Sequence, residues 1–573
     1  MDQGYGYHAE LIQRHIEMVP GYDRVRQALA QDVDVGPDTL REVLGAAAAF
    51  AEGRLLPINR AGDLQGCTYA DGRVLTPEGY KEAWTELAAA GWNCVDQPAE
   101  FGGQGLPSFI NAGCRELFDR ACMAIGMLTG PTRAGTLLLL EFADIALQQE
   151  WIPQFVAGKW SATICISEAD AGSDVGRIRT RAVQETNGEW RITGEKMWTS
   201  FGDHDLVERI GHLVLARTPD APAGTAGLSL FLVPNRVMND FGAWVGNGVV
   251  VRRIEEKLGL HGSPTCAMGF EHARAYLLGK QHRGLSQMFL MIQSMRLMVA
   301  IEGVGMSFGA EQTALKYAEE RRQGGTPENP PVTINAHADI QRQLLAMAAR
   351  VEVLRGLLYE LVVRTDAERV GVANSAEHEN VTQWLLPIAK ATCAEAAFEV
   401  PNAAIQVLGG AGYTYEWPCE QWMRDARMMS IAEGSTGIQA LDLVHRRLWR
   451  DGGRSMEDFI ETATREVNTA ESKVAIPALK VLNRLQDVGR KLLQQRNQQR
   501  DVEAGAVGFL QLAMLAATAW IAVRLISGAH DDPIGRRLAA AGQFWLSDVD
   551  ARAAFQEHEA LVGASRLESF DQI

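Results

Sequence analysis

The sequence lacks the features that mark several common protein functions. Its net charge is −16, from 55 basic and 71 acidic side chains, so it has no excess of Lys and Arg to form a nucleic-acid-binding surface. Its 8 cysteines are scattered without a CxxC pair, which argues against a zinc site or a disulfide framework. Walker A, HExxH and a strand-linked GxGxxG are missing as well, and so is a GxSxG elbow between a strand and a helix, since the GxSxG match at residues 305–309 lies inside a helical pattern. We therefore expect no nucleic-acid partner, no metal, and no hydrolase or P-loop function.

Targeting and membrane signals are also scarce. The N-terminus has no basic stretch followed by an apolar run, as a signal peptide would have. The longest apolar stretch, residues 509–526, is interrupted by Gln511 and Arg524 and is typical of a buried helix rather than a membrane span. Together with the unpaired cysteines, these patterns predict a cytoplasmic protein without a membrane span.

The residues that are present describe a long, folded chain. Its 573 residues, 47% hydrophobic and 22% charged, are more than one core usually serves. Helical periodicity predominates except in a middle region, where short β-branched runs alternate with turn formers. We predict a mainly α, α+β fold with helical domains at residues 1–157, 281–455 and 456–573 and a β domain at residues 158–280.

Residues 164–174 (ICISEADAGSD) and 194–202 (GEKMWTSFG) form the first candidate binding motif. The former ends a strand in a loop whose backbone N–H groups and Ser167 or Ser173 hydroxyls suit heterocycle or phosphate atoms. The latter offers Trp198 as an aromatic wall and Thr199 and Ser200 as hydroxyl donors. A plain turn is the commoner explanation of a Ser/Gly/Asp loop.

Residues 317–323 (YAEERRQ) end a predicted helix in two arginines before Gly324 and Gly325. Cations near a helix C-terminus usually only complement its dipole. The functional alternative is a cation presented to a pyrophosphate.

Two nearby segments, residues 406–418 (QVLGGAGYTYEWP) and 431–439 (IAEGSTGIQ), form the third motif. Glycines in the first segment allow close backbone approach to a ligand. Glu433 precedes the Gly434-Ser435-Thr436 turn that opens a helix. Taken alone, it is an ordinary acid at a helix N-terminus.

In this order and spacing, the motifs resemble the acyl-CoA dehydrogenase family over residues 80–450. Residues 164–174 are similar to its TEPxAGSD loop, although Ala169 replaces the Pro. Residues 194–202 are similar to GxKxWITNG, residues 257–265 to KxGxxGSxT, and residues 101–107 to YGGxGLP. The resemblance implies an N-terminal helical domain, a barrel-like middle domain, a C-terminal four-helix bundle and an added C-terminal helical domain.

The resemblance also implies FAD as the cofactor, in a site shared between the two subunits of a homodimer. Arg321 matches the Arg that reaches the FAD pyrophosphate from the neighbouring subunit. The cofactor-binding residues that the family motifs imply are Ile164, Ile166, Ser167, Ser173, Trp198, Ser200, Arg321, Gln323, Gln406, Gly409, Gly410, Ser435 and Gln439.

Glu433 falls on the family's catalytic glutamate, which implies 2,3-dehydrogenation of an acyl-CoA thioester to a 2-enoyl-CoA. Glu433 would remove the 2-proton while flavin N5 takes hydride from carbon 3, and electrons would pass to an electron-transferring flavoprotein. The FAD ribityl hydroxyl and the Glu433 backbone N–H would bind the thioester carbonyl. Desolvation should raise the pKa of Glu433. The substrate-binding residues implied are Ser173, Arg296, Ala432 and Gly434.

Two positions depart from the family pattern. Ala432 stands where Tyr often precedes the base, so extra volume is available for a bulky acyl chain or for a neighbouring aromatic ring. Gln293 replaces the Asp usually found three residues before Arg296. The N-terminal extension and the added C-terminal block resemble the longer branch that includes 3-methylmercaptopropionyl-CoA dehydrogenase. In that branch the terminal helices would cover the tetramer surface and leave a dimer.

Other functions use the same motifs. An acyl-CoA oxidase of this fold passes electrons to oxygen and shares every motif. A DNA-associated adaptive-response flavoprotein needs a basic C-terminal unit, but residues 474–573 carry 11 basic and 11 acidic side chains. A non-catalytic flavin scaffold is the third alternative, and an intact Glu433 argues against it.

Overall fold

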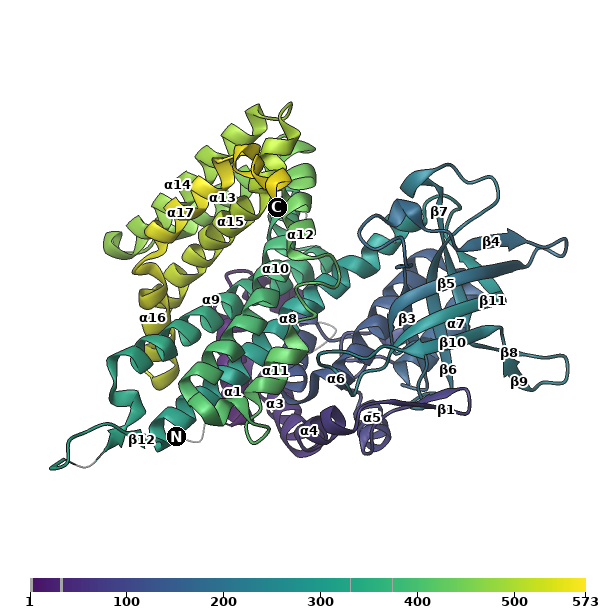
Figure 1. Ribbon diagram of the computed structural model, residues 1–573, viewed down its shortest axis with the longest axis horizontal. Helices are drawn as coiled ribbons and strands as arrows, with labels where there is room; N and C mark the ends of the chain where they lie inside the picture. The colour runs from purple at the N-terminus through teal and green to yellow at the C-terminus, as the bar shows by residue number, and fades with distance from the viewer. Residues whose placement is uncertain (1–3, 31–34, 330, 374) are drawn as a thin grey trace. The chain divides into compact units, whose positions relative to one another are not determined.

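The computed structural model describes residues 4–30, 35–329, 331–373 and 375–573. Contacts between Cα atoms divide these residues into two compact units. One consists of the N-terminal residues up to Gly45 together with Val299–Ile573, and the other of Ala46–Met298. Each unit is described separately below, and Figure 1 labels the elements of both.

The unit Ala46–Met298 holds a seven-stranded sheet with helices against it. Its helices are α4 (Leu56–Gln65), α5 (Tyr80–Ala89), α6 (Ser108–Phe142) and α7 (Ile145–Val156). The sheet strands are β3 (Trp160–Cys165), β4 (Arg181–Gln184), β5 (Trp190–Ser200), β6 (Arg209–Arg217), β7 (Leu228–Pro234), β10 (Val249–Ile254) and β11 (Thr265–Leu278). Two small hairpins are β1 (Thr68–Ala70) with β2 (Arg73–Leu75), and β8 (Arg236–Met238) with β9 (Trp244–Gly246).

The sheet closes on itself. Its strand order is β10-β11-β5-β4-β6-β3, and β7 pairs with both β11 and β6. The strands β11, β5, β4, β6 and β7 therefore form a ring, which confirms the barrel-like middle region. Val214, Phe231 and Met268 are buried in one core of this sheet. A second core joins Trp151 of α7 and Leu138 of α6 to the sheet, where these helices lie beside β3 in Figure 1.

The other unit is helical. Its elements are α1 (Tyr5–Glu17), α2 (Tyr22–Leu29), α3 (Pro37–Phe50, which continues into the other unit), α8 (Gly284–Glu320, which enters from the other unit), α9 (Ala338–Arg369), α10 (Ala376–Leu408), α11 (Cys419–Ala426), α12 (Thr436–Val444), α13 (Arg454–Val467), α14 (Ser472–Gln494), α15 (Gln499–Ser527), α16 (Pro533–Leu546) and α17 (Val549–Leu561). A short hairpin joins β12 (Arg322–Gln323) to β13 (Val332–Thr333). Side-chain caps start several helices, as where Asp532 accepts a hydrogen bond from Gly535 N at 2.7 Å at the start of α16.

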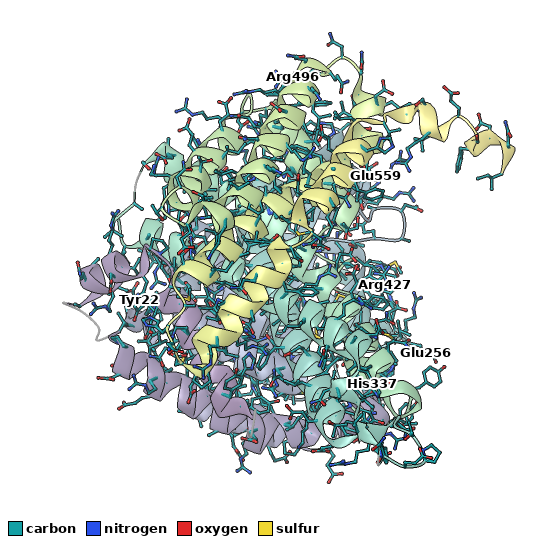
Figure 2. The ribbon with its side chains drawn as sticks, turned by 90° about the vertical axis from the view of Figure 1, so that its left-hand side faces the viewer. Tyr22, Glu256, His337, Arg427, Arg496 and Glu559 are labelled. Carbon is teal, nitrogen blue, oxygen red and sulfur yellow. The ribbon has the colours of Figure 1, made fainter. Side chains whose placement is uncertain are left out.

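The C-terminal helices pack on the bundle and on each other. α15 contacts α14, α16 and α17, and it also contacts α9, α10 and α12. Figure 2 shows Arg496 at the turn between α14 and α15 and Glu559 on α17, which runs beside α15. The added C-terminal helical region is therefore part of the same folded unit as the third motif's segment at residues 431–439.

Among the described residues, two helices are long and apolar enough to cross a membrane by length and composition. They are α8 and α15, in which 67% and 89% of the most apolar stretch is buried inside the protein. Burial accounts for the composition of α15, which covers residues 509–526, since a helix surrounded by protein is apolar on all sides.

A buried ion network connects distant parts of the helical unit. Glu352 of α9 accepts hydrogen bonds from His15 of α1 at 2.8 Å, from Arg355 at 2.6 Å and from Arg537 of α16 at 2.8 Å. These partners hold the pKa of Glu352 well below its ordinary value, although burial alone would raise it. The N-terminal and C-terminal extensions are thus anchored to the same bundle helix.

The mainly helical α+β fold class agrees with the sequence prediction. The strands of the sheet lie between Trp160 and Leu278, and α13 begins at Arg454. The three domain boundaries, after residues 157, 280 and 455, stay a prediction, and residues 1–3, 31–34, 330 and 374 lie outside the described part of those domains.

Candidate active site

The loop after β3 is fixed by Glu168. Its carboxylate accepts hydrogen bonds from Thr180 Oγ1 at 2.6 Å, from the Arg179 backbone N–H at 2.6 Å and from Lys196 Nζ at 2.8 Å. Burial would raise the pKa of Glu168, but Lys196 and these hydrogen bonds hold it below the ordinary value. The loop is therefore held by one ionised side chain, next to Ala169, which stands where the family motif has Pro.

The two parts of the first motif lie side by side. Lys196 of β5 is fully buried and also donates to the Ile166 carbonyl at 3.0 Å. The Met197 N–H donates to the Ser167 carbonyl at 2.9 Å. Ile166 and Ser167 remain partly exposed and Ser173 is exposed, so the loop presents a hydroxyl and backbone surface to solvent.

Trp198 lies on a β-bulge in β5. Lys196 pairs with Met268 and Thr199 pairs with Cys266, so Met197 and Trp198 together oppose a single residue of β11. Trp198 has φ +60°, and its side chain is 59% exposed. A left-handed backbone is costly for a residue with a Cβ, and such positions concentrate at functional sites. The bulge thus places a large aromatic ring on the surface of the sheet.

Ser200, Ile164 and Arg296 differ in accessibility. Ser200 pairs with Thr265 at the end of β5 and is partly exposed, as is Ile164 of β3. Arg296 lies on α8 and is buried, whereas Gln293, one turn earlier, is partly exposed. Within this unit, the structure thus brings the residues of the first motif together around β3 and β5.

The second segment of the third motif, residues 431–439, includes the tight loop between α11 and α12. Glu433 is half-buried with φ +55°, and Gly434 follows with φ +89°. Ser435 caps α12 by accepting a hydrogen bond from the Ile438 N–H at 3.5 Å. Arg427, labelled in Figure 2, is exposed at the start of this loop. Glu433 therefore precedes the cap of α12 and does not lie inside its first turn.

Gln439 of α12 supports the same loop. It is fully buried, and its Nε2 donates to the Glu433 carbonyl at 3.0 Å and to the Gly434 carbonyl at 3.1 Å. Its Oε1 is buried and has no hydrogen-bond partner within the residues described. A buried acceptor without a donor is unfavourable, so this atom is suited to an N–H or O–H of a bound ligand.

Lys390 is a residue of this loop's surroundings that sequence reasoning missed. It lies on α10, is fully buried, and donates to the carbonyls of Met429 at 2.9 Å, Ala432 at 2.7 Å and Gly434 at 2.7 Å. The available signal was a single cation in the apolar run of residues 384–394. Lys196 stands at the Lys of the GxKxWITNG motif, but it was not named among the site residues.

The second motif, residues 317–323, lies next to the glycine-containing segment at residues 406–418. The Tyr317 ring of α8 packs edge-on against the Trp417 ring, with centroids 5.2 Å apart. Arg321, Gln323, Gln406, Gly409 and Gly410 are all exposed. Gly409 has φ +63°, and the space that a Cβ would fill at Gly409 and Gly410 is open. An extended ligand can therefore reach the backbone there.

Comparison with known proteins identifies the family. The family models for the N-terminal, middle and C-terminal domains of acyl-CoA dehydrogenase match residues 37–159, 163–273 and 282–448. The chain belongs to the acyl-CoA dehydrogenase family, whose members are FAD-dependent oxidoreductases.

Individual relatives extend beyond those domains. The chain is 36% identical over 508 residues to 3-methylmercaptopropionyl-CoA dehydrogenase of Ruegeria pomeroyi, covering 86% of each chain. It is 35% identical over 440 residues to the broad-specificity linear acyl-CoA dehydrogenase FadE5 of Mycobacterium tuberculosis, covering 74% of this chain and 71% of that one. The predicted likeness to the longer branch is thus confirmed.

Solved structures show the same fold at lower identity. Caenorhabditis elegans ACDH-11 in complex with C11-CoA aligns with a TM-score of 0.77 at 20% identity, over 93% of this chain and 89% of that one. An acyl-CoA dehydrogenase complexed with FAD from Bacillus anthracis aligns with a TM-score of 0.72 at 19% identity, over 96% and 90%. The likeness covers most of this chain, including the added C-terminal helices.

Proposed function

We propose that this chain oxidises an acyl-CoA thioester to a 2-enoyl-CoA, with Glu433 as the base that removes the 2-proton. The observation that carries the proposal is the Glu433 loop. It presents a half-buried carboxylate at φ +55° between Ala432 and Gly434, whose carbonyls are both bound by Lys390. A base must be held in one geometry to act on a weak carbon acid.

Several features of the chain suit FAD. Trp198 offers an exposed ring, the loop at Ile166 and Ser167 offers hydroxyl and backbone groups, and Gln439 has a buried acceptor without a partner within the residues described. The glycines of residues 409–410 leave open space for a phosphate chain or adenosine, with Arg321 as the cation. We assign the thirteen cofactor residues named from the sequence to this cofactor. When bound, FAD accepts the hydride that leaves carbon 3.

The remaining chemistry falls to side chains and backbone of this chain. Glu433 takes the 2-proton on its carboxylate, and its backbone N–H stabilises the negative charge that develops on the thioester oxygen. Ala432 and Gly434 leave room beside the base for the acyl group. We assign Ser173 and Arg296 to substrate binding, and Trp198 to contact with the flavin ring.

The electron acceptor, the oligomeric state and the location are proposed from the family resemblance as well. The proposed acceptor is an electron-transferring flavoprotein rather than oxygen, because the two relatives described above are named dehydrogenases. A homodimer that shares each FAD site between subunits is part of the proposal. Placement in the cytoplasm stays a prediction.

Anaerobic mixing with a panel of acyl-CoA thioesters tests this function. The panel contains linear, branched and methylthio-substituted chains, and the flavin absorbance near its long-wavelength maximum is followed. At least one thioester should bleach the flavin within seconds. A purified protein without flavin, or a flavin that no thioester bleaches, would contradict the proposal. Reoxidation by oxygen faster than by electron-transferring flavoprotein would instead establish the oxidase.

A further inference from the structure

The environment of Lys390 is unusual for a lysine. The side chain is fully buried on α10, although removal of an ammonium group from water is expensive. An ammonium group has three N–H donors and no acceptor. All three donors have a carbonyl partner within 2.9 Å, from Met429, Ala432 and Gly434. These three carbonyls can therefore take all three donors, which a glutamine or a methionine at this position could not supply.

Those carbonyls lie on both sides of Glu433. Ala432 precedes it and Gly434 follows it, and the carbonyl of Glu433 itself accepts from Gln439 Nε2 at 3.0 Å. Three consecutive carbonyls are thus bound by side chains of α10 and α12. The backbone of Glu433 cannot rotate without breaking one of these hydrogen bonds.

The loop needs this support because its backbone is strained. Glu433 and Gly434 have φ +55° and +89° in succession. Left-handed conformations of a residue with a Cβ persist only where surrounding contacts over-determine them. Nearby, Glu395, also on α10, accepts a hydrogen bond from the Thr436 hydroxyl at the start of α12. α10 therefore holds the loop both at its centre and at its end.

We propose that Lys390 is the positioning residue for the base: it fixes the left-handed backbone of Glu433 and brings a positive charge to the carbonyls of the two residues that flank it. This inference rests on the proposed role of Glu433. The charge favours the ionised form of a nearby carboxylate and so keeps the base ready at a lower pH. Lys390 does not touch the substrate in this mechanism and acts only through the loop.

Lys390→Met tests the proposal because methionine has a similar length but no charge or N–H donor. The variant should retain FAD and bind acyl-CoA within threefold of the wild type. Its anaerobic flavin reduction should slow by about 100-fold, the loss expected from a displacement of about 1 Å in a reacting group. The pH at which reduction reaches half its maximum should rise, because the ammonium charge is gone.

Two further variants separate positioning from general stability. Lys390→Gln keeps two donors without the charge, so its rate should fall between those of the wild type and Lys390→Met, and it serves as the test if Lys390→Met does not fold. Leu485→Ala removes a fully buried side chain of α14 and should lower Tm while leaving the reduction rate unchanged.

The outcomes distinguish this inference from the function on which it rests. A wild type that no acyl-CoA reduces contradicts the proposed function. A wild type that is reduced, together with a Lys390→Met or Lys390→Gln variant that is reduced within fivefold of it and with the same pH profile, contradicts only the positioning role. An equal loss of rate in Leu485→Ala would also contradict it, because destabilisation would then explain the effect.

Discussion

At the scale of single residues, two buried lysines hold the loops of the candidate site. Lys196 binds the Ile166 carbonyl and the Glu168 carboxylate, and Lys390 binds the carbonyls around Glu433. Burial lowers the pKa of Lys196, and the paired Glu168 carboxylate opposes that shift. In each case a buried ammonium group holds an irregular backbone segment through hydrogen bonds, where proline or regular secondary structure would otherwise do so.

The sequence pointed to Glu433, Trp198 and Ser435 because they stand in motifs with fixed spacing. It could not point to Lys390, which lies 43 residues before Glu433 and reaches the loop only after α10 has packed against α11 and α12. Nor could it show that Glu433 has a positive φ, since the motif alone indicates an ordinary helix start. Tertiary contacts decided both features.

Two buried histidines, His212 of β6 and His204 of the loop before β6, should make this part of the protein sensitive to acid. Burial lowers the pKa of His204 and of His212 to about 3, from an ordinary value of 6.5. His212 Nδ1 lies 2.8 Å from the Thr163 hydroxyl. Because the folded state favours the neutral ring, each histidine's contribution is complete above about pH 6.5 and is lost as the pH falls toward 3.

His212→Gln should therefore reduce the acid sensitivity. Each such histidine costs about 1.4 kcal/mol of unfolding free energy per pH unit below 6.5. The slope of unfolding free energy against pH should fall by about that amount between pH 6 and 4, as measured by urea unfolding. His272→Gln, at an exposed position, serves as the control. An unchanged slope in His212→Gln would show that the ring is not neutral in the folded protein.

At the scale of helices, the C-terminal extension is joined to the bundle by Arg524 of α15. Its guanidinium donates to Glu360 of α9 at 2.8 Å and to both carboxylate oxygens of Glu466 of α13 at 2.7 Å. Burial alone would raise the pKa of Glu360, but Arg524 and Arg364 lower it to about 2. Glu360 is therefore ionised inside the protein and depends on its cations.

Arg524→Met should destabilise the helical unit strongly. Removal of one partner from a buried ion pair leaves an uncompensated charge and costs about 3–5 kcal/mol. Chemical denaturation followed by circular dichroism measures the loss. Arg496→Met, at the exposed turn seen in Figure 2, should change stability by less than about 0.5 kcal/mol. Equal stability of the two variants would mean that the Arg524 network contributes nothing.

Helical and strand patterns predicted the fold class because amphipathic periodicity depends on local sequence. The sequence did not predict that β7 closes the sheet by pairing with β11 and β6, because strand order depends on contacts distant in the chain. It predicted a buried helix near residues 509–526, and α15 there is almost entirely buried. It did not reveal that α1 and α16 share Glu352 on α9.

At the scale of the whole molecule, the N- and C-terminal extensions affect the expected oligomeric state. α15, α16 and the N-terminal helix α1 cover α9 of the bundle. We predict that covering this helix leaves a dimer, with a mass twice the 62.7 kDa of one chain. Light scattering coupled to size exclusion measures that mass on the FAD-loaded protein. A tetramer would show that the N- and C-terminal extensions do not cover the surface through which shorter relatives form tetramers.

The role of Glu433 is tested most directly by anaerobic rapid mixing of Glu433→Gln with the thioester that reduces the wild-type flavin. Glutamine has the same shape and a similar tolerance of the local backbone, but it cannot accept the 2-proton at neutral pH. The variant should keep its yellow cofactor and still bind the thioester, while flavin reduction falls by about 10²–10⁴-fold, the usual contribution of a general base. Reduction of Glu433→Gln at a rate near that of the wild type would exclude Glu433 as the base.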